Sequence, residues 1–187
     1  MKKILILILI VITASLIGGI YGAIHDQLTY TISPEYYTKF KFIQFELVDK
    51  GQEANPASPR VWVAAVGFLA TWWMGVPIGL ILGLVGLAHT NWQTMFSVTM
   101  KAFLVTMAVA FITGIIGLVY GCLVLANEPV ESFSNWFIPD NIIDFKGFIT
   151  VGSMHNFSYA GGVIGLIVGI IYSLGQKRMK KAGMVAA

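Results

Sequence analysis

Charged residues and cysteine are both scarce in this sequence. Only 11% of its 187 residues are charged, whereas 57% are hydrophobic. About 25% of the residues of a typical soluble domain are charged, so the composition excludes an ordinary soluble fold. Because Cys122 is the single cysteine, an intrachain disulfide is excluded, and cysteine usage does not reveal the redox compartment.

Sequence motifs for the common catalytic chemistries are absent as well. No glycine-rich phosphate loop leads into a basic residue, no HExxH or ExxH pair is present, and no CxxCH haem-attachment motif occurs. These motifs serve nucleotide binding, metal ligation on one helix and c-type haem attachment. The ligands of a metal site would therefore come from separate helices.

What the sequence does contain is four long apolar runs. They cover residues 4–24, 61–88, 102–126 and 148–174. A helix needs about 20 apolar residues to cross the hydrocarbon of a bilayer. Lipid leaves no water to pair free backbone groups, so each run is expected to be a helix. The predicted fold class is an all-α integral membrane protein, a four-transmembrane-helix bundle that forms a single membrane domain over residues 1–187.

The first apolar run also has features of a secretory signal, because Lys2 and Lys3 precede it. The run is longer than the core of a signal peptide. Cleavage after Ala23 would also place the bulky Tyr21 where a small residue is preferred. We therefore expect a retained membrane anchor.

The charged residues predict the orientation of the helices. Segments 1–3, 89–101 and 175–187 contain seven of the twelve basic residues and none of the nine acidic ones. The outer cap segment, 25–60, and the outer loop, 127–147, contain the other five basic residues and all nine acidic ones. Loops rich in Lys and Arg stay in the cytoplasm, so we expect a plasma (inner) membrane protein with both termini cytoplasmic. The basic tail then anchors to anionic lipid of the bilayer, and no nucleic-acid partner is expected.

Both extracytoplasmic segments are amphipathic. In the outer cap segment, Ser33 followed by Pro34 is typical of a helix start with Ser33 as its cap. Apolar residues then recur on one helical face, at Tyr36, Phe40, Ile43 and Leu47. We expect a helix along the outer membrane surface, preceded by a short strand at 28–32. The alternative is a strand over 39–42, where Lys and Phe alternate.

Glycines recur at intervals of four in the last three apolar runs. They are Gly75, Gly79 and Gly83, then Gly117 and Gly121, then Gly161, Gly165 and Gly169. This GxxxG spacing lets helices approach closely in lipid, so it predicts tight packing within the bundle. The alternative is a face for a homo-oligomer, which the same spacing also fits.

The histidines and acidic residues indicate a polar pocket on the outer side. His25 follows the first run, and His155 lies about 10 Å inside the fourth at 1.5 Å per residue, so both lie toward the outer side, whereas His89 lies toward the inner one. Imidazoles with carboxylates are ligands of zinc, iron or manganese. The candidate metal ligands are His25, Asp26, Glu128 and His155, and the candidate pocket residues are Glu35, Asn156 and Tyr159.

Each candidate ligand also has a purely structural interpretation. His25 and Asp26 would end a helix among the lipid headgroups, Glu128 would end one in water, and a neutral His155 would bond to a backbone carbonyl. An ionisable group within a span usually faces protein or a water-filled cavity, which favours a functional His155. Imidazole rings within about 5 Å could share one ion, and rings beyond about 10 Å could not.

Three functions follow from these observations. The first is a membrane protein with an outward-facing His/carboxylate pocket, a divalent-metal site that serves a membrane-embedded enzyme. The second is a non-catalytic subunit or assembly factor that binds a larger membrane complex. The third is a small transporter, which we rank last because 61–88 and 102–126 contain no Asp, Glu, Lys, Arg or His.

Overall fold

The computed structural model describes residues 1–49, 53–181 and 183, and all regular structure in this part of the chain is helical. Four long helices dominate: α1 (Lys2–Ile32), α3 (Pro59–Gly86), α4 (Trp92–Leu123) and α5 (Phe145–Lys181). Each is long and apolar enough to cross a membrane. The all-α class and the four long apolar helices are thereby confirmed.

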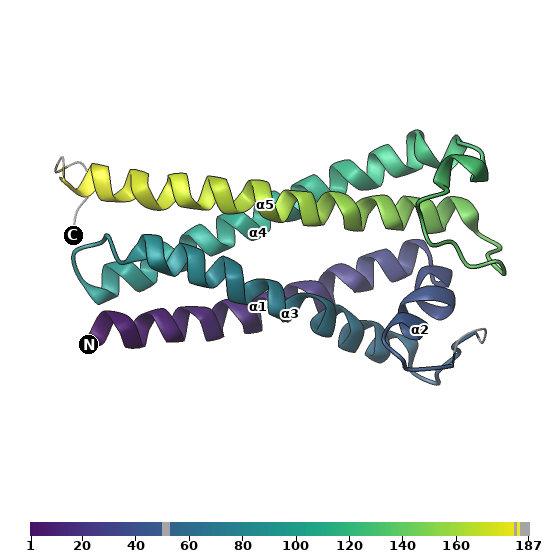
Figure 1. Ribbon diagram of the computed structural model, residues 1–187, viewed down its shortest axis with the longest axis horizontal. Coiled ribbons are helices and arrows are strands. Elements are labelled where there is room, and N and C mark those ends of the chain that lie inside the picture. Colours follow the sequence, from purple (N-terminus) through teal and green to yellow (C-terminus); the bar gives the residue numbers. More distant parts are fainter. Residues whose placement is uncertain (50–52, 182, 184–187) are drawn as a thin grey trace.

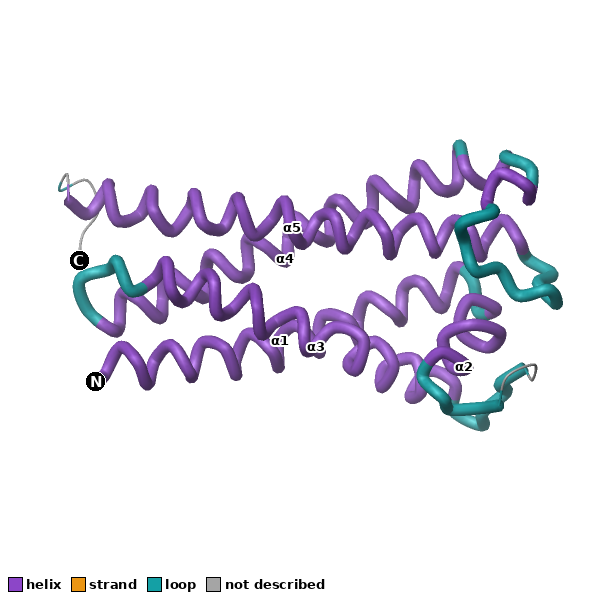
Figure 2. The backbone as a smooth tube through the Cα atoms, in the orientation of Figure 1, coloured by secondary structure: helices purple, strands orange, loops and turns teal. Residues whose placement is uncertain are grey.

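The four long helices form two pairs. α1 packs along α3 and α4 packs along α5, while the two pairs touch each other less extensively. In Figure 1 each pair crosses near its middle, and the start of α1 and the end of α5 lie at one end of the bundle, which we call the termini end. At the opposite end, the cap end, the chain between α1 and α3 and the chain between α4 and α5 form the loops and short helices seen in Figure 2.

Close approach within each pair depends on glycine. A Cβ added to Gly75 of α3 would meet the carbonyl of Ala14 on α1, and one added to Gly165 of α5 would meet the carbonyl of Thr106 on α4. Neither neighbour is a flexible side chain that could move aside. Both crossings therefore bring one helix against the backbone of the other, as small residues allow.

Three of the long helices extend well beyond their apolar runs. α1 continues to Ile32, so the predicted strand at 28–32 is wrong and His25 lies inside the helix instead of after it. The added turns are stabilised because Thr29 is fully buried and its hydroxyl is hydrogen-bonded to Tyr37. α4 begins at Trp92, where Asn91 accepts a hydrogen bond from the Thr94 N–H (2.8 Å) and so caps the helix. The third of these helices, α5, starts at Phe145 and continues into the basic tail.

The segment after α1 is helical, which excludes the alternative strand over 39–42. It consists of a π-helical turn, η1 (Tyr37–Lys41), and a short α2 (Phe42–Gln44). The predicted side-chain cap at Ser33 is wrong, because the Ser33 hydroxyl is buried and makes no hydrogen bond. Tyr37 and Phe42 are fully buried, so this segment packs onto the bundle and closes the cap end.

The loop between α4 and α5 completes the cap end. It contains two 3₁₀ turns, η2 (Leu125–Asn127) and η3 (Val130–Phe133). Lys39 of η1 donates a hydrogen bond to the carbonyl of Asn141 (2.8 Å) in this loop and also pairs with Glu35. The two halves of the cap thus hold each other over the ends of both helix pairs.

Candidate metal centre

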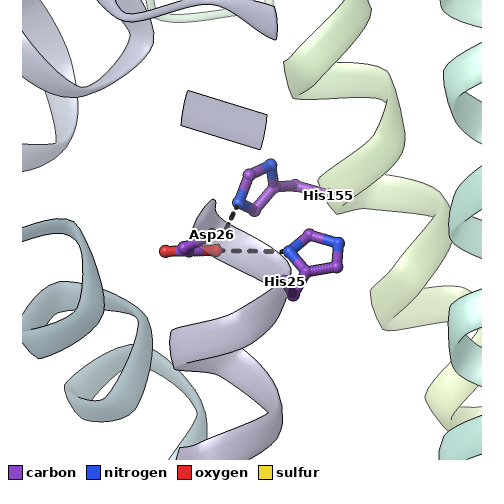
Figure 3. Close-up of side chains that lie close together, drawn as sticks. All are labelled: His25, Asp26 and His155. Carbon is purple, nitrogen blue, oxygen red and sulfur yellow. Dashed lines mark hydrogen bonds and ion pairs between the residues drawn. The ribbon is translucent and has the colours of Figure 1, made fainter. Parts of the chain in front are cut away.

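Two histidines and one aspartate meet between the helix pairs near the cap end. His25 and Asp26 come from α1 and His155 comes from α5, and Figure 3 shows both imidazoles directed at one carboxylate oxygen. Asp26 Oδ1 lies 3.2 Å from His25 Nδ1 and 3.4 Å from His155 Nε2. All three residues are buried, with 4–7% of their surface exposed. The imidazole centroids are 5.1 Å apart, close to the separation expected of two rings that share an ion.

The orientation of His155 is fixed by its own helix and by the cap. Its Nδ1 lies 3.0 Å from the carbonyl oxygen of Val151, one turn earlier in α5. A carbonyl only accepts, so Nδ1 carries the hydrogen and donates it. The Tyr36 ring stacks on the face of the His155 ring, with centroids 5.0 Å apart and an interplanar angle of 21°. These contacts hold Nε2 toward Asp26.

His155 Nε2 is the atom that a purely structural interpretation leaves unexplained. It is buried and has no hydrogen-bond partner, and it lies 3.4 Å from Asp26 Oδ1, within ion-pair distance. In a neutral imidazole whose Nδ1 is protonated, Nε2 carries a lone pair. A buried lone pair beside a carboxylate oxygen is unfavourable unless a cation or a proton lies between them. The hydrogen bond to Val151 therefore satisfies only one of the two ring nitrogens.

The second histidine has a partner on each side. His25 Nδ1 faces Asp26, and its Nε2 lies 3.3 Å from the hydroxyl oxygen of Ser158 on α5. If Nδ1 binds a metal, Nε2 carries the hydrogen and donates it to Ser158. An outer hydrogen bond of this kind commonly fixes the tautomer of a metal-binding histidine.

Two of the three spacings between the candidate ligand atoms suit a tetrahedral ion. Two ligands, each about 2.1 Å from a zinc ion, lie about 3.4 Å apart at the tetrahedral angle. The two nitrogen–oxygen distances at Asp26 are 3.2 and 3.4 Å, and the ligand atoms of His25, Asp26 and His155 all lie within 4.8 Å of one another. The His/Asp cluster is therefore compatible with metal binding. Three protein ligands would leave at least one coordination position for water or substrate.

A cavity of about 90 Å³ extends from the cluster between the two helix pairs. Its lining is polar near the cluster, where Tyr21, Lys41 and Tyr159 also contribute, and mainly apolar beyond it. The apolar part includes Met74, Ile78, Phe103 and Met107. The cluster therefore lies at the wall of a narrow apolar space and not at an open aqueous surface.

Lys41 places a positive charge on the same cavity. Its side chain is 8% exposed, its Nζ donates to the side-chain oxygen of Gln44 (3.0 Å), and it lies 5.3 Å from the ring centroid of Phe40. Burial lowers the pKa of Lys41, and the charge of Asp26 partly offsets this effect. Within the described part of the chain, no carboxylate lies within ion-pair distance of Lys41.

The remaining residues singled out from the sequence lie elsewhere at the cap end, except for Tyr159. Glu128 is exposed directly after η2, and it is not one of the residues that converge on Asp26. Asn156 is exposed on α5 and lines a separate hollow with Trp136. Tyr159 is 41% exposed and lines the cavity beside the cluster.

Glu35 joins the two parts of the cap and does not face the cluster. It pairs with Lys39 and accepts hydrogen bonds from the N–H groups of Ile143 (2.9 Å) and Asp144 (2.8 Å). Burial alone would raise the pKa of Glu35, but these bonds outweigh it and lower the pKa below its usual 4.5.

Neither Lys41 nor Tyr36 was predicted as a neighbour of the site. Both lie in the outer cap segment. Tyr36 belongs to its apolar stripe, which was expected to face the membrane surface, and Lys41 lies off that stripe. Comparison with protein-family models, with curated proteins and with solved structures found no match for this chain. The function is therefore inferred from the geometry of the site.

Proposed function

We propose that this chain is a polytopic membrane protein that binds one divalent metal ion through His25, Asp26 and His155 and uses it to activate water. The convergence of three buried ligand atoms, all within 4.8 Å of one another, carries this proposal. The unpartnered Nε2 of His155 supports it, because a metal ion bound between that atom and Asp26 would satisfy both.

The ligand set narrows the identity of the ion. Two imidazoles and one carboxylate suit zinc, iron(II) or manganese, whereas magnesium and calcium prefer oxygen ligands alone. Three protein ligands with an open position are typical of catalytic sites and not of structural zinc sites, which are closed by four. Metal-bound water at such a position ionises near neutral pH and becomes a nucleophile. A membrane-embedded enzyme that acts on a substrate from the lipid phase fits this chemistry.

The distribution of charge predicts on which side of the membrane the proposed site lies. All nine acidic residues belong to segments 25–60 and 127–147, and basic residues without acids surround both termini. By the positive-inside rule the termini are then cytoplasmic, and the metal site lies in the half of the bundle near the extracytoplasmic face of the plasma membrane.

Metal analysis of the purified protein tests the proposal. We expect about one equivalent of zinc, iron or manganese after loading and removal of loosely bound ions, and its loss in His155→Ala and His25→Ala. His89→Ala is the matched control, because His89 is equally buried but lies at the termini end. Absence of stoichiometric metal from the wild type would falsify the metal centre, as would an equal loss in all three variants.

The open coordination position has its own test. In cobalt(II)-loaded protein, the visible absorption of the ion reports its coordination. We expect azide to change this spectrum by displacing bound water, and His89→Ala to respond like the wild type. A spectrum that no small anion changes would contradict an exchangeable water ligand.

A further inference from the structure

The formal charge of the metal-loaded site favours binding of an anion. Asp26 contributes one negative charge, Lys41 one positive charge and a divalent ion two positive charges, so the loaded site carries a formal charge of plus two. Asp26 is the one carboxylate among the described residues that line the cavity. Uncompensated charge in a buried, largely apolar site is costly, so a bound anion would stabilise it.

The cavity beyond the cluster suits an alkyl chain. Met74 and Ile78 of α3 line it from one helix pair, and Phe103 and Met107 of α4 line it from the other. At about 90 Å³ it is much smaller than the roughly 300–1,000 Å³ of pockets for drug-sized ligands. The space therefore admits one slender apolar segment, and burial of such a segment is favourable.

The cavity also extends to the flank of the bundle, where one of its lining residues is exposed and another is half-buried. Tyr159 lines it and is 41% exposed, and Gly162, one turn along α5, lines it as well. A Cβ added to Gly162 would meet no atom within 4 Å. This opening lies on the flank of a bundle whose long helices are apolar enough to face lipid, so a chain could enter from the hydrocarbon.

We propose that the site binds a single-chain anionic amphiphile of the lipid phase, whose carboxylate or phosphate lies between the metal ion and Lys41 while its chain enters the cavity. This inference rests on the proposed metal centre and names the substrate or product class of that site. Lys41 is then a binding residue for the headgroup, and its contacts with Gln44 and the ring of Phe40 hold it at the cavity.

Headgroup binding can be measured through the cobalt(II) spectrum of the loaded full-length protein in non-ionic detergent. The probes are a long-chain fatty acid, the monoalkyl phosphate of the same chain, the neutral alcohol of that chain, acetate and inorganic phosphate. We expect at least one long-chain anion to change the spectrum at a concentration at least tenfold below that needed for acetate or inorganic phosphate. The neutral alcohol should leave the spectrum unchanged.

Two variants separate the headgroup from the chain. Lys41→Met should weaken binding of the long-chain anion at least tenfold, while the metal content stays at one equivalent. Gly162→Phe should block binding of the long-chain anion but leave the change that azide causes in the cobalt(II) spectrum intact. Gly175→Phe is its matched control, because Gly175 also lies on α5 with open space around it but does not line the cavity.

The outcomes distinguish this inference from the metal centre beneath it. Equal potency of acetate, phosphate and the long-chain anions would overturn the amphiphile in favour of a free anion. A spectral response to the alcohol, or an unchanged affinity in Lys41→Met, would overturn the role of charge. Each of these results, obtained with a full complement of metal, counts against the inference alone. Absent metal in the same samples would overturn the metal centre and the inference together.

Discussion

At the cap end of the bundle His25 and His155 share Asp26, whereas at the termini end His89 lies beside a hydroxyl group. His89 is 4% exposed, and its Nε2 lies 3.1 Å from the Ser173 hydroxyl oxygen on α5. All three histidines are therefore buried and in contact with a polar group. Among the described residues, the difference is the carboxylate and the second imidazole found at the cap end. Burial of a histidine in an apolar bundle is thus weak support for a metal site, and the convergence of candidate ligands from two helices supports one better.

The largest effect expected from this contrast is that of Asp26→Asn. The substitution keeps the shape of the side chain but removes the charge that both imidazoles face. Loss of an outer hydrogen-bond partner alone costs about 10–100-fold in metal affinity, so we expect loss of this direct ligand to cost more than about 100-fold. Competition with a chromogenic chelator measures the affinity.

The same chemical change elsewhere at the cap end serves as the control for Asp26→Asn. Asp144 accepts a hydrogen bond from the N–H of Gly147 (2.9 Å) at the start of α5, a capping role that asparagine also fills. Asp144→Asn should keep wild-type metal affinity. If the two variants lost affinity equally, the cap end would bind metal through its general negative charge and not through the cluster.

A smaller effect, on stability, is expected for Glu35→Gln. Lys39 is buried, and this change would leave its ammonium with an uncharged partner while it weakens the bonds to Ile143 and Asp144. We expect a loss of about 1–3 kcal/mol in the free energy of unfolding. The control is Glu128→Gln at an exposed position, which should change stability by less than about 0.5 kcal/mol. Denaturant titration in detergent measures both.

The Glu35 contribution should also depend on pH. The pKa of this carboxyl is lowered in the folded protein below its usual 4.5, so the unfolded chain binds the proton more tightly. The stabilisation is therefore complete well above pH 4.5 and is lost as the pH falls through the lower, folded-state value. The stability difference between wild type and Glu35→Gln should shrink on acidification, and a difference that grew instead would contradict the assignment.

The comparison of the two ends also shows how far the sequence predicts the fold. The four apolar helices were predictable because an apolar run of about 20 residues matches the hydrocarbon thickness of a bilayer. Their ends were not, since residues 28–32 of α1 are polar enough to resemble a loop or strand. They stay helical because the cap segment buries Thr29 and its hydroxyl is bonded to Tyr37. That contact depends on tertiary packing, which hydropathy does not encode.

The site was predictable to a similar degree. Charge predicted that His25, Asp26 and His155 share one side of the membrane, and helical geometry predicted that His155 lies inside its helix. The same reasoning grouped Glu128 with them, because sidedness assigns an end of the bundle but not a position around it. Lys41 was not predicted as a site residue, because a lysine in an amphipathic segment usually faces solvent. Its burial follows from how η1 packs onto the bundle.

The smallest effect is expected at the termini end, for Ser173→Ala. Ser173 is 1% exposed, and removal of its hydroxyl takes one polar contact from His89. We expect a loss of about 0.5–1.5 kcal/mol in the free energy of unfolding, the usual contribution of one hydrogen bond, and no change in metal content. Ser158→Ala is the informative counterpart, because Ser158 contacts His25 at the cap end and its loss should weaken metal binding about 10–100-fold. If Ser173→Ala lowered metal affinity as much as Ser158→Ala, the two ends would be coupled through α5, and the division of the bundle into a metal-binding end and a purely structural end would be wrong.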